Sequence, residues 1–152
     1  MNHKKSVVDI LLVDDDADDR NIFSDALGEL KINTSLNLLE DGRDLLGYLQ
    51  NKKNKRPQIL FLDLNMPYKS GVECLKEIRQ YSEFDDLTIA IYSTSSTDKD
   101  IEDTFVNGAN IYIKKPKNFE KLKTVLNDVV NMNFQFHNSG LNKDTFLLNI
   151  NS

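Results

Sequence analysis

The stretch VVDILLVDDD, residues 7–16, decides the fold. It is a nearly continuous apolar run that stops at three consecutive aspartates. Continuous runs of aliphatic residues are typical of strands in a parallel sheet, because such strands are buried on both faces. A half-polar run at residues 35–39 fits an edge strand of the same sheet. Three further apolar runs repeat the first pattern, at residues 59–62, 89–92 and 111–113.

Between these runs, apolar residues recur every three or four positions, which is the spacing of a helix with one buried face. The chain therefore contains five strand–helix units between residue 7 and about residue 130. This alternation predicts an α/β fold, a parallel sheet covered by helices on both faces. Among open five-stranded sheets, we expect the flavodoxin-like (βα)5 doubly wound sheet with strand order 2-1-3-4-5. A closed (β/α)8 barrel would need many more residues.

The composition describes a soluble globular domain and excludes several functions. The chain has 152 residues, of which 39% are hydrophobic and 28% charged. Its formal net charge of −5 argues against nucleic-acid binding, which needs a basic face. No apolar run approaches the ~20 residues that span a bilayer, so we expect no membrane association. The lone Cys74 suits the reducing cytoplasm, and the only histidines, His3 and His137, lie in terminal segments.

Three segments follow from these patterns. Residues 1–6 are expected to be an N-terminal tail, residues 7–130 the folded domain, and residues 131–152 a C-terminal tail. Apolar and polar residues alternate at 134–136 and 146–150, on either side of an Asn-Ser-Gly turn signal. This segment could form a small hairpin, an arm that pairs with a neighbouring chain, or a mostly disordered tail. It is too short for a helix-turn-helix output domain, so we expect output through protein contacts or through a later phosphotransfer step.

Polar residues follow four of the predicted strands, at the edge where doubly wound sheets carry their binding sites. They are Asp14, Asp15 and Asp16 after the first strand, Asp63 after the third, Ser93 and Thr94 after the fourth, and Lys115 after the fifth. Converging carboxylates repel one another and raise one another's pKa unless a cation is present. Mg²⁺ binds one or two carboxylates together with waters and phosphate oxygens. We therefore expect Asp14, Asp15 and Asp63 to hold Mg²⁺.

A phosphoryl group could bind above such a metal. A carboxylate can act as the nucleophile and form an acyl phosphate, and the central position of Asp63 suits that role. Lys115 could bind the phosphoryl oxygens as a point charge, and Ser93 could donate a hydrogen bond to them. Each residue alone has a plainer interpretation, such as a helix cap, a strand-end hydroxyl or a surface lysine. Their combination on four strands favours the chemical interpretation.

The sequence resembles the receiver domain of two-component response regulators. The matching pieces are LLVDDD at 11–16, LFLDLNMP at 60–67, IYST at 91–94 and YIKKP at 112–116. The resemblance implies that Asp63 is the phosphoacceptor for a histidine of a sensor kinase. It also implies that Mg²⁺ is bound directly by Asp15, directly or through water by Asp14, and by the backbone carbonyl of Asn65.

The resemblance implies a switch as well. Lys115 would pair with Asp63 or the phosphoryl group, and the Lys115–Pro116 bond would be cis. Ser93 corresponds to the switch hydroxyl. Thr94 follows it where many receivers carry alanine, so it would narrow access to Asp63 and join Lys115 and Ser93 among the residues that bind the phosphoryl group. Tyr112, otherwise a core residue, corresponds to the aromatic that turns inward when this hydroxyl moves. The fourth helix, fifth strand and fifth helix would then present a changed surface to a downstream protein or to a second copy of the chain.

A long basic loop at residues 51–56, together with Thr94, resembles the single-domain regulators that are paired with bacterial phytochromes. We therefore expect a cytoplasmic, bacterial signalling switch and not a turnover enzyme. The alternative is a binding module of the same fold that no longer uses phosphorylation. A phosphatase of the haloacid dehalogenase type needs a second aspartate where this chain has Asn65. No glycine-rich phosphate loop follows the first strand, so nucleotide binding has no support.

Overall fold

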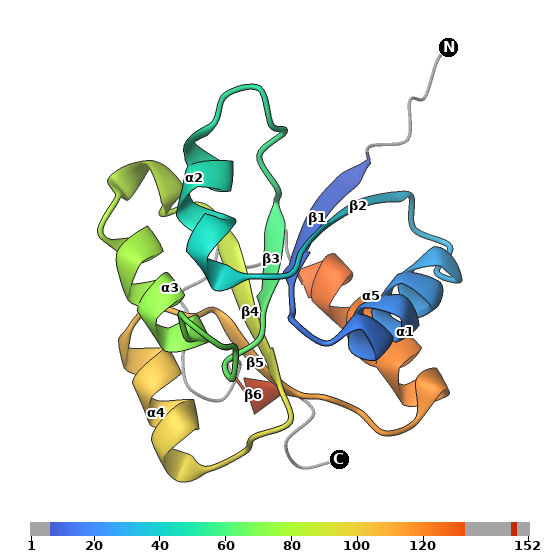
Figure 1. Cartoon of the computed structure of the whole chain (residues 1–152). Helices are drawn as coiled ribbons and strands as arrows, with labels where there is room; N and C mark the ends of the chain where they lie inside the picture. The colour runs from blue at the N-terminus through green and yellow to red at the C-terminus, as the bar shows by residue number, and fades with distance from the viewer. Residues whose placement is uncertain (1–6, 133–146, 149–152) are drawn as a thin grey trace.

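Strands and helices alternate along the chain as the apolar patterns predict. The computed structural model describes residues 7–132 and 147–148 (Figure 1). The first five strands are β1 (Val8–Val13), β2 (Thr34–Leu39), β3 (Ile59–Leu62), β4 (Thr88–Ser93) and β5 (Ile111–Lys114). The helices are α1 (Ala17–Gly28), α2 (Leu45–Gln50), α3 (Gly71–Arg79), α4 (Asp98–Val106) and α5 (Phe119–Met132). Two 3₁₀ turns, η1 (Gly42–Asp44) and η2 (Ser82–Phe84), precede α2 and β4.

The five strands pair in parallel in the order β2-β1-β3-β4-β5, which confirms the predicted topology. The order reverses at β1 and β3, so the residues that follow these two strands lie side by side at the carboxyl edge of the sheet. Here Val13 is in register with Leu62, and the next residues along the two strands are Asp14 and Asp63. The topology alone therefore brings together two of the predicted carboxylates.

A sixth short strand extends the sheet. Strand β6 (Leu147–Leu148) pairs in parallel with β5, with Leu147 opposite Tyr112 and Leu148 opposite Ile113. The sequence left the segment 131–152 open between a hairpin, an arm and a disordered tail. Its first two residues belong to α5, which ends at Met132, and the rest of it apart from β6 lies outside the described residues. The predicted N-terminal tail at 1–6 lies outside them too.

Two apolar layers lie on the two faces of the sheet. Helices α1 and α5 cover one face, and α2, α3 and α4 cover the other (Figure 1). Successive residues of β1 enter opposite layers, because side chains alternate across a strand. Ile10 and Leu12 pack under α1 and α5, whereas Leu11 and Val13 pack under α2 and α3. Strand β2 is only half-buried, as predicted for an edge strand.

One apolar residue of the predicted helix stripes lies at the surface. Ile22 of α1 is 46% exposed, whereas its neighbour Phe23 is fully buried against Phe61 and Tyr92. Ile22 instead lines a cavity of about 220 Å³ between α1 and the start of α5, together with Pro116. Among the described helices, none is both long enough and apolar enough to cross a membrane.

Candidate functional site

The three aspartates after β1 have two roles: one caps helix α1, and the other two belong to the candidate site. Asp16 is the N-cap of α1, and its side chain accepts a hydrogen bond of 3.1 Å from the backbone N–H of Asp19. The backbone N–H of Asp16 in turn donates to Asp14 Oδ1 at 3.0 Å. The capping interpretation therefore holds for Asp16. The side chains of Asp14 and Asp15 remain available for the rim of the sheet.

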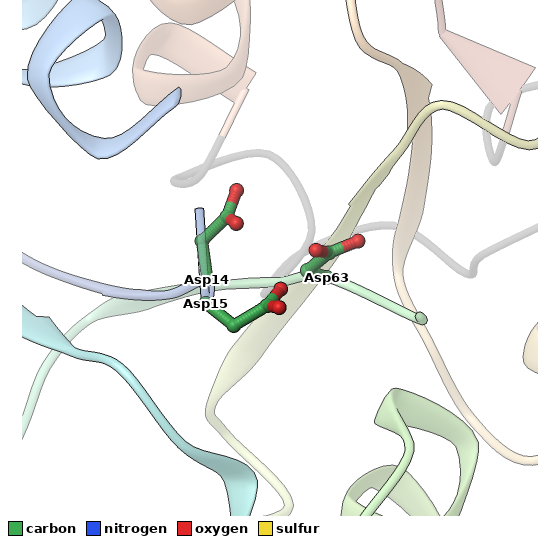
Figure 2. A group of neighbouring side chains, drawn as sticks. All are labelled: Asp14, Asp15 and Asp63. Carbon is green, nitrogen blue, oxygen red and sulfur yellow. The ribbon is translucent and has the colours of Figure 1, made fainter. Parts of the chain in front are cut away.

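Three carboxylates converge at the ends of β1 and β3 (Figure 2). Oxygens of Asp14, Asp15 and Asp63 all lie within 4.8 Å of one another. Asp14 and Asp63 are buried, and Asp15 is exposed. An oxygen-only donor set at this spacing fits a hard divalent cation such as Mg²⁺ or Mn²⁺. The cluster is therefore a candidate divalent metal site, made of the three carboxylates that the sequence predicts.

A glycine positions the loop that carries Asp63. Gly71, the first residue of α3, donates its N–H to the Leu64 carbonyl at 2.9 Å. A Cβ atom at Gly71 would stand 2.2 Å from the backbone oxygen of Asp63, far inside van der Waals contact. Only glycine lets the helix approach the phosphoacceptor candidate so closely. The side chain of Ser70 then caps α3 by accepting from the N–H of Glu73 at 3.2 Å.

Lys115 reaches three carboxylates from the end of β5. Its Nζ atom lies 2.8 Å from Asp14 Oδ2, 2.8 Å from Asp19 Oδ2 and 3.6 Å from Asp63 Oδ2. Burial lowers the pKa of the ammonium group, but the hydrogen bonds to Asp14 and Asp19 outweigh it and leave the pKa above its usual value. Lys115 is therefore a fixed positive charge in the site. All described peptide bonds are trans, so the cis Lys115–Pro116 bond that the resemblance implies is absent here.

The surroundings of Asp63 change the pKa of its carboxyl group. Burial raises its pKa to about 7, Lys115 works against this, and the charge of Asp14 adds to it. The backbone N–H of Asn65 hydrogen-bonds to the Asp63 carboxylate and favours the charged form. A cation in the cluster would remove the repulsion and favour ionised Asp63, which is the nucleophilic form.

The predicted switch residues meet at Ser95. Ser93 is fully buried at the end of β4, and its Oγ accepts a hydrogen bond of 3.1 Å from the Ser95 N–H. Tyr112 is also fully buried, and its hydroxyl donates to the Ser95 carbonyl at 2.7 Å. The Ser95 hydroxyl hydrogen-bonds to Asp100 in the first turn of α4. Tyr112 therefore occupies the inward position beneath the loop that follows β4. Thr94 is exposed at the same strand end.

Sequence reasoning missed three residues that touch this site. Asp19 pairs with Lys115, although the two residues are 96 positions apart in the chain. Tyr92 places its ring 5.3 Å from Lys115 Nζ, and Asp100 binds Ser95. An acidic residue in the first turn of α1 was visible in the sequence, but helix capping and the helix dipole explain such residues equally well.

Comparison with known proteins shows the family to which the chain belongs. The sequence profile of the response regulator receiver domain matches residues 10–127. The response regulator Rcp1 of Synechocystis sp. is 31% identical over 117 residues, which cover 74% of this chain and 80% of Rcp1. The chain therefore belongs to the response regulator receiver family. Receiver domains of this family act with sensor histidine kinases and downstream targets.

Solved structures show the same fold. The phosphorylated cyanobacterial phytochrome response regulator RcpA superposes with a TM-score of 0.77 at 25% identity, covering 90% of this chain and 99% of RcpA. The Mn²⁺-bound form of Rcp1 superposes with a TM-score of 0.73 at 28% identity, covering 88% of this chain and 98% of Rcp1. A divalent cation in Rcp1 fits the acidic cluster of this chain, because manganese and magnesium prefer the same oxygen ligands.

Proposed function

We propose that this chain is a phosphorylation-controlled switch in which Asp63 accepts a phosphoryl group from a histidine of a sensor kinase. One observation carries the proposal. The carboxylates of Asp14, Asp15 and Asp63 lie within 4.8 Å of one another, with the Lys115 ammonium 3.6 Å from Asp63. A nucleophile, a metal cage and a fixed cation are the parts that phosphoryl transfer to a carboxylate requires.

The transfer replaces one phosphorus bond with another. An Asp63 oxygen attacks phosphorus, the P–O bond forms, the P–N bond breaks, and its electron pair returns to the imidazole nitrogen. Asp14, Asp15, Asp63 and the Asn65 backbone carbonyl are the proposed ligands of Mg²⁺, which would offset the negative charge that gathers during transfer. Lys115 then binds a phosphoryl oxygen, with Ser93 and Thr94 beside it. The chain passes on a signal and does not turn over a substrate, so it is a switch and not an enzyme.

The switch acts through Ser93 and Tyr112. When the Ser93 hydroxyl turns to a phosphoryl oxygen, it gives up its hydrogen bond with the Ser95 N–H. Ser95 also holds Tyr112 and α4, so this movement reaches the surface formed by α4, β5 and α5, where β6 lies along the outer side of β5. Val106 of α4 is 69% exposed, which gives that surface an apolar side chain for a downstream protein. A phosphoryl group favours one of two states only through such differential contacts.

The proposed partner is a sensor histidine kinase of the phytochrome type, acting in the bacterial cytoplasm. The support comes from the likeness to the phytochrome response regulator RcpA. Membranes and nucleic acids are not proposed as partners, because the chain carries a net charge of −5. A homodimer through α4, β5 and α5 stays a prediction. Because β6 already pairs with the outer side of β5, a second copy would contact β6 there together with α4 and α5. Sedimentation velocity with and without beryllofluoride tests it.

The proposal is tested by intact-mass measurement. Protein incubated with Mg²⁺ and acetyl phosphate should gain one phosphoryl group, and the gain should disappear with a chelator or with Asp63→Asn. Asp86→Asn, an exposed aspartate just before β4, is the matched control and should keep the gain. No gain from acetyl phosphate or from a phosphorylated kinase would contradict the proposal. Partner binding that is indifferent to both Asp63→Ala and beryllofluoride would instead support a receiver-like binding module.

A further inference from the structure

Lys115 is drawn to one side of the site. Its two short contacts, both 2.8 Å, are to Asp14 and to Asp19, whereas its distance to Asp63 is 3.6 Å. An ammonium group has three N–H donors, so two of them already have partners other than the phosphoacceptor. At 3.6 Å the remaining contact is an ion pair that is too long for a hydrogen bond.

Asp19 is well placed to hold this position. It is the third residue of α1, and the Asp16 cap on its backbone N–H fixes the start of the helix. The positive end of the helix dipole favours a carboxylate in this turn. The Lys115 side chain is only 9% exposed, and Tyr92 covers it with a ring centroid 5.3 Å from Nζ. The ammonium group is therefore enclosed by α1 and β4 as well as by the acidic cluster.

Asp14 and Asp19 differ in where they lie relative to a bound metal ion and phosphoryl group. Asp14 belongs to the carboxylate cluster, so it remains beside the metal and the phosphoryl group when they bind. Asp19 is not one of those three carboxylates, and its own carboxylate pairs with Lys115 at 2.8 Å. A phosphoryl group on Asp63 needs a donor from Lys115, and an ammonium that moves toward it moves away from Asp19.

We propose that Asp19 is a positioning residue that holds Lys115 on the α1 side of the site and thereby weakens the grip of Lys115 on a phosphoryl group at Asp63. This inference rests on the proposed function, because it concerns the strength with which the same site holds its phosphoryl group. Asp19 thus keeps the Lys115 ammonium group in a position from which it must move before it can donate a hydrogen bond to a phosphoryl group on Asp63.

The test uses beryllofluoride, a phosphoryl mimic, titrated by calorimetry into the full chain with saturating Mg²⁺. Asp19→Asn should bind it about threefold more tightly than the unaltered chain, the size expected for one partly exposed ion pair. Asp18→Asn is the matched control, because Asp18 is exposed, carries the same charge and lies in the same turn of α1. Its affinity should stay unchanged.

Two results would overturn the inference. The first is unchanged or weaker binding by Asp19→Asn, and the second is equal tightening by Asp18→Asn, which would indicate general repulsion between α1 and the anion. A helix merely damaged by the substitution would not bind the mimic more tightly, so the sign of the change separates positioning from a structural role.

A second measurement separates this inference from the proposed function. In metal-free buffer, the unfolding free energies of Asp19→Asn, Lys115→Met and the double variant form a cycle. The double variant should lose less stability than the sum of the two single losses, and strict additivity would overturn the pairing. If the cycle shows the pairing but the unaltered chain binds no beryllofluoride, the result contradicts the proposed function and not the Asp19–Lys115 pairing.

Discussion

The hydroxyl of Tyr112 donates a 2.7 Å hydrogen bond to the backbone carbonyl of Ser95, so strand β5 is tied to the loop that leads into α4. The same serine donates its N–H to Ser93 and binds Asp100 through its hydroxyl. One residue thus links the strand end beside Asp63 to the surface that a partner would contact. A change at Asp63 has a short and continuous route to that surface.

Replacing Tyr112 with phenylalanine tests this link. Tyr112→Phe leaves the Ser95 carbonyl without its donor, so the free energy of unfolding should fall by about 1 kcal/mol. Tyr81→Phe is the control, because Tyr81 is exposed, and its loss should stay below about 0.5 kcal/mol. Urea unfolding followed by circular dichroism measures both. Equal losses in the two variants would contradict a specific role for the Tyr112 hydroxyl.

Stability should depend on pH through Asp63. Burial raises the pKa of Asp63 from its usual 3.8 to about 7, so between these values the folded chain holds a proton that the unfolded chain has released. The unfolding free energy of metal-free protein should therefore fall as pH rises from about 4 to about 7.

Asp63→Asn should remove this dependence, because the amide does not ionise. The variant should be more stable than the unaltered chain at pH 8, by roughly a few kcal/mol, and should approach it below pH 4. Denaturant titrations at four pH values measure the difference. Saturating Mg²⁺ should make the unfolding free energy of the unaltered chain depend less on pH. A difference in stability between Asp63→Asn and the unaltered chain that grows on acidification would contradict a raised pKa of Asp63.

The close approach of α3 to Asp63 predicts a strong effect at one glycine. Gly71→Ala places a methyl group against the Asp63 backbone, so we expect a loss of about 2 kcal/mol or more and slower phosphorylation. Gly47→Ala is the control, because its added Cβ in α2 would meet no atom within 4 Å beyond its chain neighbours and the backbone of its own helix. That variant should gain about 0.5–1 kcal/mol from helix propensity. Thermal unfolding and acetyl phosphate kinetics check both, and a tolerated Gly71→Ala would refute the packing argument.

Arg79 should affect stability without affecting the chemistry. At the end of α3 its guanidinium group donates to three backbone carbonyls and to Asn110 Oδ1, at distances of 2.7–2.9 Å. These partners lie before β4 and β5, at the opposite end of the sheet from Asp63. Arg79→Lys should cost about 3 kcal/mol, because a lysine cannot reach all four acceptors.

The control for Arg79 is Arg56→Lys. Arg56 is half-exposed and pairs with the exposed Glu83, so this change should cost less than about 1 kcal/mol. Both variants should keep the phosphorylation rate of the unaltered chain, as measured by intact mass at a temperature where each is folded. A large drop in the phosphorylation rate of Arg79→Lys would contradict a purely structural role for Arg79.

The sequence predicts the strands and the acidic cluster because both leave local signals. Buried parallel strands appear as continuous apolar runs such as residues 7–13, and the strand order places Asp14 beside Asp63 without knowledge of any contact. The match of residues 10–127 to the response regulator receiver domain confirms the family resemblance. The roles of Ser93, Thr94 and Lys115 in phosphoryl binding stay predictions.

Long-range partners leave no such signal. The Asp19–Lys115 pair joins residues 96 positions apart, and an acidic residue in a first helical turn has a sufficient local explanation. The partners of Arg79 include backbone carbonyls, which every residue carries. Strand β6 was missed as part of the sheet because the alternation at residues 146–150 suits any pairing partner.

Strand β6 decides which end of the sheet can take up another polypeptide. Leu147 and Leu148 occupy the outer side of β5, so the chain itself closes that end. At the other end, within the described residues, β2 pairs only with β1 and keeps an outer row of main-chain donors and acceptors. A peptide that docks by strand addition therefore has direct access to β2, whereas at β5 it must first compete with the chain's own C-terminal residues.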